Sequence, residues 1–235
     1  MKTKNVSCEN CASKDKGIFC NLDHEALGEV STHKVMNSYK KGQTIFYQGN
    51  PPFGLYCINQ GKIKVSRLGN DGKETIVRIA GAGDVLGHRS LFSNENYEAT
   101  ATALDDVAIC FLDKKFIHEA IKEEPSVALN LIQKLSKEMG AAEARNASMF
   151  QKSVRERLAE LLLSLKTTFG IKEGSAYRLD IKLTREEMAS MIGTTNETVI
   201  RIFSDFKEEG LIRQEGKIIF LEDAEALIDV ANFQY

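Results

Sequence analysis

The sequence predicts an α+β protein made of a jelly-roll β-barrel, a long helix and a C-terminal winged helix-turn-helix, in that order. Glycine-punctuated β-like runs fill residues 41–112, helical spacing with few breakers fills residues 124–169, and two capped helices follow residue 183. The expected parts are an N-terminal cysteine-bearing segment over 1–29, a barrel over 30–115, a long-helix region over 116–150 and a winged domain over 151–235.

The composition is that of an ordinary globular protein. The 235 residues are 43% hydrophobic, yet no run approaches the roughly 18 apolar residues of a membrane span, and no apolar stretch follows the N-terminal lysines. We therefore expect a cytoplasmic protein without a membrane partner. The net charge of -2 favours no partner. Five cysteines without an export signal indicate a reducing compartment, where clustered thiols serve more often as metal ligands or redox groups than as disulfides.

Six short β-like runs predict the barrel. Residues 69–72, between two of these runs, give the strongest hairpin signal in the chain. Many short strands at this spacing are typical of a sandwich or a jelly roll. The expected strands cover residues 44–47, 54–58, 62–67, 75–80, 99–103 and 107–112.

A long helix is expected to begin at Pro125, which suits the first turn of a helix. Apolar or small residues then recur at steps of three or four, which is the spacing of one helix face. We expect this face to pair with a second copy of the chain in a homodimer, and the alternative is that it covers the barrel. The expected dimer seam is formed by Leu131, Leu135, Met139, Ala142, Asn146 and Met149.

A helix-turn-helix pattern follows the long helix. Thr184 can cap a first helix, with Glu187 three residues on, as in a capping box. Gly193 stands where the turn needs a positive φ, and Thr195 can cap a second helix over residues 195–209. The buried face of this second helix is expected to hold Val199, Ile202, Phe203 and Phe206.

The first turns of the second helix offer polar side chains to solvent. In a helix-turn-helix this surface enters the DNA major groove, where an Arg can pair with guanine and a Glu can accept a hydrogen bond from cytosine. The expected DNA-reading residues are Thr195, Asn196, Glu197, Ile200 and Arg201. Glu197 and Arg201 stand four residues apart, so an ion pair between them on the helix surface is the alternative.

Residues 212–220 read as two short strands round a tight turn, which would form a wing beside the helix pair. Residues 151–235 hold 12 Lys and Arg against 15 Asp and Glu, so this part lacks the basic excess of a nonspecific DNA binder. Binding would then depend on a dimer that meets two half-sites and on single basic residues near phosphates. These residues are Lys152, Arg155, Arg185, Arg201, Arg213 and Lys217.

This order of barrel, long helix and winged helix resembles the cyclic-AMP receptor protein and fumarate-nitrate regulator (CRP/FNR) family of bacterial transcription regulators. The resemblance implies a homodimer, not an enzyme, that binds a palindromic promoter element and contacts RNA polymerase. Glu197 and Arg201 fall where the family's half-site readers lie, which implies a half-site containing TGA. The segments that carry the resemblance are residues 41–46 (KGQTIF), 54–64 (GLYCINQGKIK), 83–87 (GDVLG), 157–158 (RL) and 194–201 (TTNETVIR).

The barrel departs from the cyclic-nucleotide branch of this family. In that branch a Glu and an Arg-Ser pair hold the cyclic phosphate, whereas here His88 takes the place of the Glu, and Tyr97 and Glu98 take the place of the pair. A carboxylate at that position would repel the phosphate. We therefore do not expect cyclic AMP as the ligand.

The cysteines resemble those of the fumarate-nitrate (FNR) branch. There, three N-terminal cysteines and one distant cysteine in a late barrel strand hold an oxygen-labile [4Fe-4S] cluster. The resemblance implies Cys8, Cys11, Cys20 and Cys110 as cluster ligands and oxygen or redox state as the signal. Cys57 lies among apolar residues of an expected strand, and we expect it to pack as a small apolar side chain.

Other interpretations of these residues stay open. The four thiolates could hold Zn²⁺, Cys8 and Cys11 could form a thiol switch, or Cys110 could belong to the core while the barrel binds a small molecule. Haem at His88 is a further alternative. A cupin enzyme is the interpretation from another class, but it lacks a metal-ligand constellation because the four histidines are scattered, as His24, His33, His88 and His118.

Ala142 bears on how the signal couples to association. Oxygen-responsive relatives carry an acidic side chain at the corresponding seam position, which opposes dimerisation until the cluster offsets it. Two alanines can approach each other without charge repulsion. We therefore expect a dimer whose association depends less on the cluster.

Overall fold

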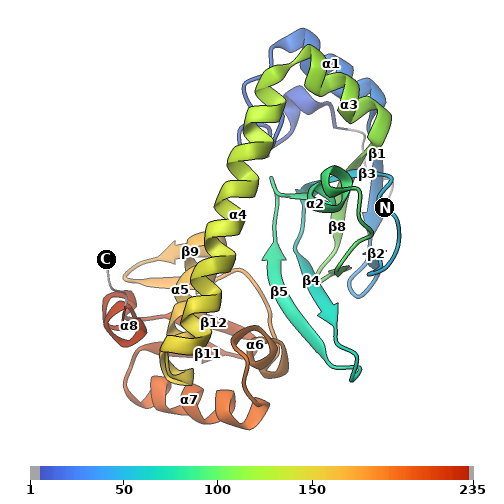
Figure 1. The fold of residues 1–235 in the computed structure, drawn as a ribbon. Coiled ribbons are helices and arrows are strands. Elements are labelled where there is room, and N and C mark those ends of the chain that lie inside the picture. Colours follow the sequence, from blue (N-terminus) through green and yellow to red (C-terminus); the bar gives the residue numbers. More distant parts are fainter. Residues whose placement is uncertain (1–5, 233–235) are drawn as a thin grey trace. The chain divides into compact units, whose positions relative to one another are not determined.

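The computed structural model describes residues 6–232 (Figure 1). The chain forms two compact units that meet along the sequence between Ala141 and Ala142. Helix α4 (Pro125–Gln151) contributes to both units, because the division falls within it. No helix among the described residues is long and apolar enough to cross a membrane.

Two four-stranded antiparallel sheets form a β-sandwich in the first unit. One sheet has the strand order β1-β8-β3-β6 and the other β2-β7-β4-β5. Ile58 and Ile109 of the first sheet pack with Ile63 and Ala101 of the second in one apolar core, which confirms the jelly-roll prediction. The strands are β1 (Val35–Tyr39), β2 (Thr44–Phe46), β3 (Gly54–Gln60), β4 (Ile63–Leu68), β5 (Glu74–Ala80), β6 (Val85–Leu86), β7 (Thr100–Ala103) and β8 (Val107–Asp113).

All six expected strands are present, and the β4–β5 pair is the predicted hairpin around residues 69–72. Strands β1 and β6 were not among the expected strands. Strand β1 follows helix α1 (His24–His33) after Lys34 alone, without a glycine or proline to mark its start. Strand β6 has only two residues, too few to show a periodicity.

The β1-β8-β3-β6 sheet has a second apolar face, which the N-terminal segment covers. Because side chains alternate along a strand, Leu55 and Leu112 point away from the sandwich core. They pack with Ile18 and Val30 of the N-terminal segment. This second core also receives helices: η1 (Cys8–Asn10) and α1 lie before the sandwich in sequence, α2 (His88–Ser93) lies within it, and α3 (Lys114–Glu123) and α4 follow it.

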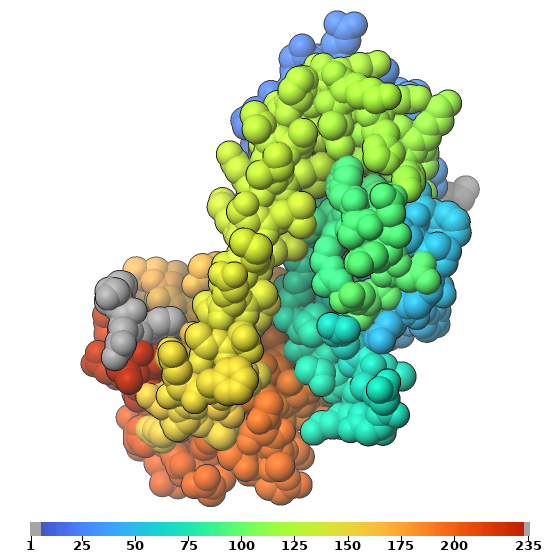
Figure 2. Space-filling model, viewed as in Figure 1, coloured from blue at the N-terminus to red at the C-terminus, as the bar shows by residue number. Residues whose placement is uncertain are grey.

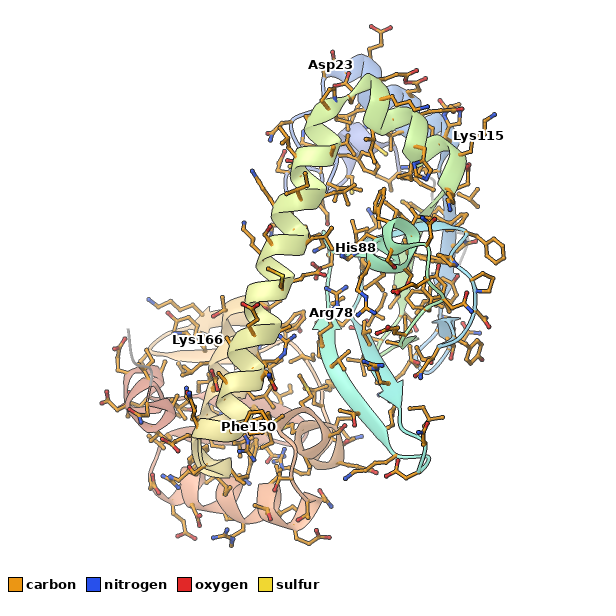
Figure 3. All side chains as sticks on the ribbon, viewed as in Figure 1. Asp23, Arg78, His88, Lys115, Phe150 and Lys166 are labelled. Carbon is orange, nitrogen blue, oxygen red and sulfur yellow. The ribbon has the colours of Figure 1, made fainter. Side chains whose placement is uncertain are left out.

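Helix α4 confirms the predicted long helix, and its residues differ in burial. Leu131 is 4% exposed and lies in the second core of its own chain, so it does not face a partner as expected for the seam. Leu135 is half-buried, and Met139, Ala142, Asn146 and Met149 are exposed. Most residues of the second half of α4 are exposed (Figure 2), although Ser148 is buried, and Phe150 near its end (Figure 3) has 84% of its surface exposed.

The second unit is the predicted winged helix domain, with one four-stranded sheet in the order β11-β12-β10-β9. Ser153 caps α5 with a capping box. Strands β9 and β10, which extend the wing sheet beyond β12, were not expected from the sequence. The elements are α5 (Val154–Phe169), β9 (Gly170–Glu173), β10 (Ala176–Leu179), α6 (Arg185–Ile192), α7 (Asn196–Glu208), β11 (Ile212–Glu215), β12 (Ile218–Leu221) and α8 (Ala224–Ala231).

Candidate functional site

The turn between α6 and α7 has the predicted caps. The Thr184 hydroxyl accepts a hydrogen bond from the Glu187 backbone N–H at 3.1 Å, and the Glu187 carboxylate accepts one from the Thr184 N–H at 2.8 Å. Gly193 has φ +65°, the left-handed conformation that favours glycine. The Thr195 hydroxyl then accepts from the Thr198 N–H at 3.3 Å and starts α7. These local signals confirm the helix-turn-helix.

Helix α7 has one buried and one exposed face. The exposed residues include every expected DNA reader, namely Thr195, Asn196, Glu197, Ile200 and Arg201. The buried face holds Val199, Ile202, Phe203 and Phe206, as expected. Within residues 6–232 no ion pair joins Glu197 to Arg201, and hydrogen bonds from its own backbone N–H and from Thr195 hold the pKa of Glu197 below its ordinary value. Both charged side chains are exposed, and neither is neutralised by the other.

The basic residues expected near phosphates fall into two groups. Four of them have partners inside the unit: Arg155 pairs with Glu209, Lys152 with Glu160, Arg213 with Glu222, and Arg185 donates to Gln214. Arg201 and Lys217 are exposed and form no ion pair among the residues that the structure describes. These two cations are the ones most available to phosphates or bases.

Arg157 connects the end of α4 to the end of α6. Its Nε donates to the carbonyl of Ile192 at 2.9 Å, and its Nη1 donates to the carbonyl of Lys152 at 2.7 Å. A guanidinium presents several donors in a fixed fork, so one side chain can hold two helix ends together. Arg157 contributed to the family resemblance, but the sequence alone gave it no role.

Four cysteines line one cavity of about 70 Å³ in the first unit: Cys8, Cys11, Cys57 and Cys110. Cys8 and Cys11 come from the N-terminal segment. Cys57 on β3 and Cys110 on β8 are register partners, so both point from the outer face of the sheet. The cavity thus lies between the N-terminal segment and this face.

Two polar side chains contact sulfur atoms at the cavity. Lys34, only 8% exposed, donates from Nζ to Cys8 Sγ at 3.5 Å, and Asn59 donates from Nδ2 to Cys11 Sγ at 3.1 Å. Burial raises the pKa of the Cys57 thiol, and the charges of the other three cavity cysteines raise it further. Burial also raises the pKa of Cys110, while the Lys34 ammonium opposes this effect. The cavity therefore carries one buried cation beside thiols that a metal could hold as thiolates.

Three of the four predicted ligands share this cavity, but Cys20 does not line it. The Cys20 sulfur accepts a hydrogen bond from Asn21 Nδ2 at 3.7 Å, and its carbonyl accepts one from Asn130 Nδ2 of α4 at 3.2 Å. Within residues 6–232 no three His, Cys, Asp or Glu side chains form a ready-made metal site. The assignment of Cys20 stays a prediction. Cys57 packs against the apolar core of this unit, as expected, and it also lines the cavity, which the sequence did not predict.

A polar network connects the barrel to α4 within the first unit. Glu138 Oε2 lies 2.9 Å from His88 Nε2, and Glu138 Oε1 lies 2.5 Å from Arg78 Nη1. His88 and Arg78 are labelled in Figure 3. Lys134 reaches the same carboxylate at 3.3 Å. Burial alone would raise the pKa of Glu138, but the hydrogen bond from His88 and the charges of Arg78, His88 and Lys134 lower it to about 2.

Glu98 stands where the cyclic-nucleotide branch has part of its phosphate-binding Arg-Ser pair. Glu98 pairs with Arg89 and lies 3.6 Å from Arg67 Nη1. These contacts lower the pKa of Glu98, so the carboxylate is ionised. The two arginines that could meet an anion here already face an internal negative charge.

Comparison with known proteins gives matches over most of the chain. Residues 36–124 match the family model "Cyclic nucleotide-binding domain", and residues 156–230 match "Crp-like helix-turn-helix domain". The chain is 31% identical over 211 residues to a "CRP-like cAMP-activated global transcriptional regulator" of Mycobacterium tuberculosis, covering 90% of this chain and 94% of that protein.

Two further matches agree with these. The chain is 27% identical over 230 residues to the "Transcriptional activator protein anr" of Pseudomonas aeruginosa, covering 97% and 93% of the two chains. The solved structure of FixK2 from Bradyrhizobium japonicum matches with a TM-score of 0.76 at 23% identity, covering 86% and 99%. The matched models, the relatives and the helix-turn-helix geometry together show that this chain belongs to the CRP/FNR family of DNA-binding transcription regulators.

Proposed function

We propose that this regulator senses oxygen or redox state through a [4Fe-4S] cluster held by cysteine thiolates at the N-terminal cavity. The observation that carries the proposal is that Cys8, Cys11 and Cys110, from two distant parts of the sequence, line one cavity. Thiolates are the usual protein ligands of iron–sulfur clusters, and a bound cluster would supply oxygen-labile links between the N-terminal segment and the barrel.

The contacts of the N-terminal segment support a route for the signal. Asn130 of α4 donates hydrogen bonds to the carbonyls of Ile18 and Cys20 at 3.0 and 3.2 Å. Val127 and Leu131 of α4 pack in the same apolar core as Ile18. A change in the position of this segment would therefore act directly on α4. A differential affinity of a few kcal/mol between two arrangements of α4 is enough to shift their populations.

The proposed output of this sensor is DNA binding by a homodimer. Exposed apolar residues such as Met139 and Met149 on α4 support pairing of two copies along the predicted seam. The dimer would place two α7 helices on a palindromic site, with Arg201 on guanine and Glu197 on cytosine of a TGA-containing half-site. RNA polymerase is the further partner that we propose. Because Ala142 carries no charge, we expect the cluster-free protein to be dimeric in a size-exclusion mass measurement.

Cyclic AMP is not part of this proposal. The barrel carries Glu98 between Arg67 and Arg89, so an added phosphate would meet a carboxylate and compete with it for the two arginines. The name of the mycobacterial relative describes a cAMP-activated protein. Isothermal titration of cyclic AMP into this protein is expected to show no specific binding.

Anaerobic purification with metal and sulfide analysis tests the cluster. We expect a brown protein with equal amounts of iron and inorganic sulfide, whose visible absorption bleaches in air. If the protein contained zinc but no sulfide, the cluster proposal would be wrong and the site would be a structural zinc site. A colourless protein without metal would overturn the sensing proposal and favour a small molecule in the barrel or a thiol switch.

A further inference from the structure

We propose that Cys57 supplies the fourth thiolate of the metal centre, together with Cys8, Cys11 and Cys110, in place of Cys20. The inference rests on the proposed cysteine-held cofactor and names its ligands. Four observations in the first unit carry it: strand register, contacts of the N-terminal segment, the cavity lining and the surroundings of Cys20.

Strand register brings Cys57 next to Cys110. The two residues are direct partners of the antiparallel β3–β8 pair, and directly opposed residues have Cβ atoms about 4.5 to 5.5 Å apart on one face of the sheet. The residues before and after them show which face this is, because Ile58 and Ile109 lie in the sandwich core. Cys57 and Cys110 therefore form a pair of thiols on the face that the N-terminal segment covers.

The N-terminal segment brings its C-x2-C cysteines to the same face. Asn59, which lines the cavity together with Cys57, donates to Cys11 Sγ at 3.1 Å. Cys8 is held from the other side by Lys34, which directly precedes β1. Both thiols are therefore held at the cavity that Cys57 and Cys110 also line.

The cavity lining selects these four sulfurs from the five cysteines in the chain. Cys8, Cys11, Cys57 and Cys110 border the same space, and Cys20 does not. Four thiolates are the number that a [4Fe-4S] cluster or a tetrahedral Zn²⁺ takes. The four cavity cysteines reach this number without Cys20, and a bound metal centre would have to draw their sulfurs together, since no three of them form a ready-made site within residues 6–232.

The contacts of Cys20 lie outside the cavity. Its carbonyl oxygen is bound by Asn130 of α4, and its sulfur accepts a hydrogen bond from the side chain of the next residue, Asn21. Asn21 has φ +68°, which marks a turn before α1 begins. This segment docks on α4 through its backbone, so the role of Cys20 that follows from the contacts is structural.

Matched single variants test the assignment. Wild-type protein, Cys57→Ala and Cys20→Ala are loaded anaerobically with ferrous iron and sulfide, and bound iron, bound sulfide and visible absorption are measured. We expect Cys57→Ala to lose most of the cluster and Cys20→Ala to keep the wild-type amount. Circular dichroism checks that each variant is folded before the loads are compared. Cys57→Ser is the second variant if Cys57→Ala fails to fold. Wild-type loading of the Cys57 variants, or a loss confined to Cys20→Ala, would overturn the assignment.

A second probe separates this inference from the proposed cluster. Co²⁺ bound by thiolates gives charge-transfer absorption that grows with the number of sulfur ligands. If wild-type protein takes up Co²⁺ but no iron–sulfide cluster, the proposed sensing fails. The Cys57 assignment then stands if Cys57→Ala lowers the absorption per bound Co²⁺ and Cys20→Ala does not, and it falls if the two variants behave the other way round. Wild-type protein that binds neither probe overturns both proposals.

Discussion

The β3–β8 strand pair and helix α7 are built alike but are covered differently. In each, one face closes an apolar core, through Ile109 in the strand pair and Phe203 in the helix, both at most 1% exposed. The opposite face carries the side chains that we assign to function, Cys110 and Arg201. The N-terminal segment covers Cys110, whereas Arg201 is exposed. The difference suits the strand pair to a small ligand enclosed by the chain, and α7 to a large partner that approaches from outside.

Removing the charge of Arg201 on α7 gives the largest expected effect. In Arg201→Ala we expect binding to a palindromic duplex with TGA half-sites to weaken by about 2 kcal/mol for each half-site, hence about 4 kcal/mol for the dimer, because the proposed bidentate contact to guanine would be lost. The measurement is fluorescence anisotropy at fixed salt.

The matched control for this variant is Lys207→Ala, an exposed cation near the other end of α7. We expect it to weaken binding far less. The free energy of unfolding of both variants should stay within about 0.5 kcal/mol of the wild type, because neither side chain is buried. Equal losses of affinity in the two variants would remove Arg201 from base reading.

Substitutions at two neighbouring residues of β8 should have different effects, because their side chains lie on opposite faces of the sheet. Ile109→Ala removes a fully buried side chain of the sandwich core, and we expect the free energy of unfolding to fall by about 3 kcal/mol. Urea titration followed by circular dichroism measures this loss. Cys110→Ser, one position further, is expected to cost less stability but to lose bound iron and sulfide. If the two variants lost stability and metal to the same extent, the division of labour between the faces would be wrong.

Helix α7 could be predicted because its signals are local in the sequence. The capping box of Thr184 and Glu187, the positive φ of Gly193 and the cap at Thr195 each depend on residues within a few positions, and the structure confirms all of them. The exposed reading face then follows from helical periodicity alone. Because these interactions are short in range, the recognition helix could be predicted from the sequence.

The cavity could be predicted only in part, because its walls depend on contacts between distant residues. Cys57 and Cys110 become neighbours through the register of β3 with β8, and a single sequence does not reveal that register. The apolar neighbours of Cys57 instead favoured a core residue. Leu131 shows the same limit, since helical spacing does not distinguish a core of the same chain from a dimer seam.

Helix α4 allows the comparison to be extended, because one side carries Glu138 against the barrel while Met139 is exposed. The pKa of Glu138 is lowered from 4.5 to about 2, so its stabilising effect is complete above pH 4.5 and is lost as the pH falls toward 2. A shift of this size corresponds to about 3 kcal/mol, and solvent screening at a side chain that is 30% exposed reduces the expected loss to about 2 kcal/mol.

Glu138→Gln isolates this contribution from that of other carboxylates. Urea titrations at several pH values should show the variant less stable than the wild type at pH 7 and equally stable near pH 2. Met139→Gln on the exposed side is the control and should show no such pH dependence. A constant difference between Glu138→Gln and wild type across this range would mean that the carboxylate charge is not what stabilises the contact.

The smallest expected effect concerns the turn that sets the direction of α7. Gly193 has φ +65°, and a Cβ at this position would lie 3.3 Å from Met149 Sδ. Gly193→Ala should therefore lower the free energy of unfolding by about 1 kcal/mol, because an L-residue is strained in the left-handed region. Gly193→Asn is the matched variant, since Asn tolerates this conformation better, and it should retain more stability than the alanine variant despite its larger side chain. If instead the two variants ranked by side-chain size, crowding against Met149 rather than backbone conformation would be the reason for glycine here, and the reading face of α7 would depend on the end of α4.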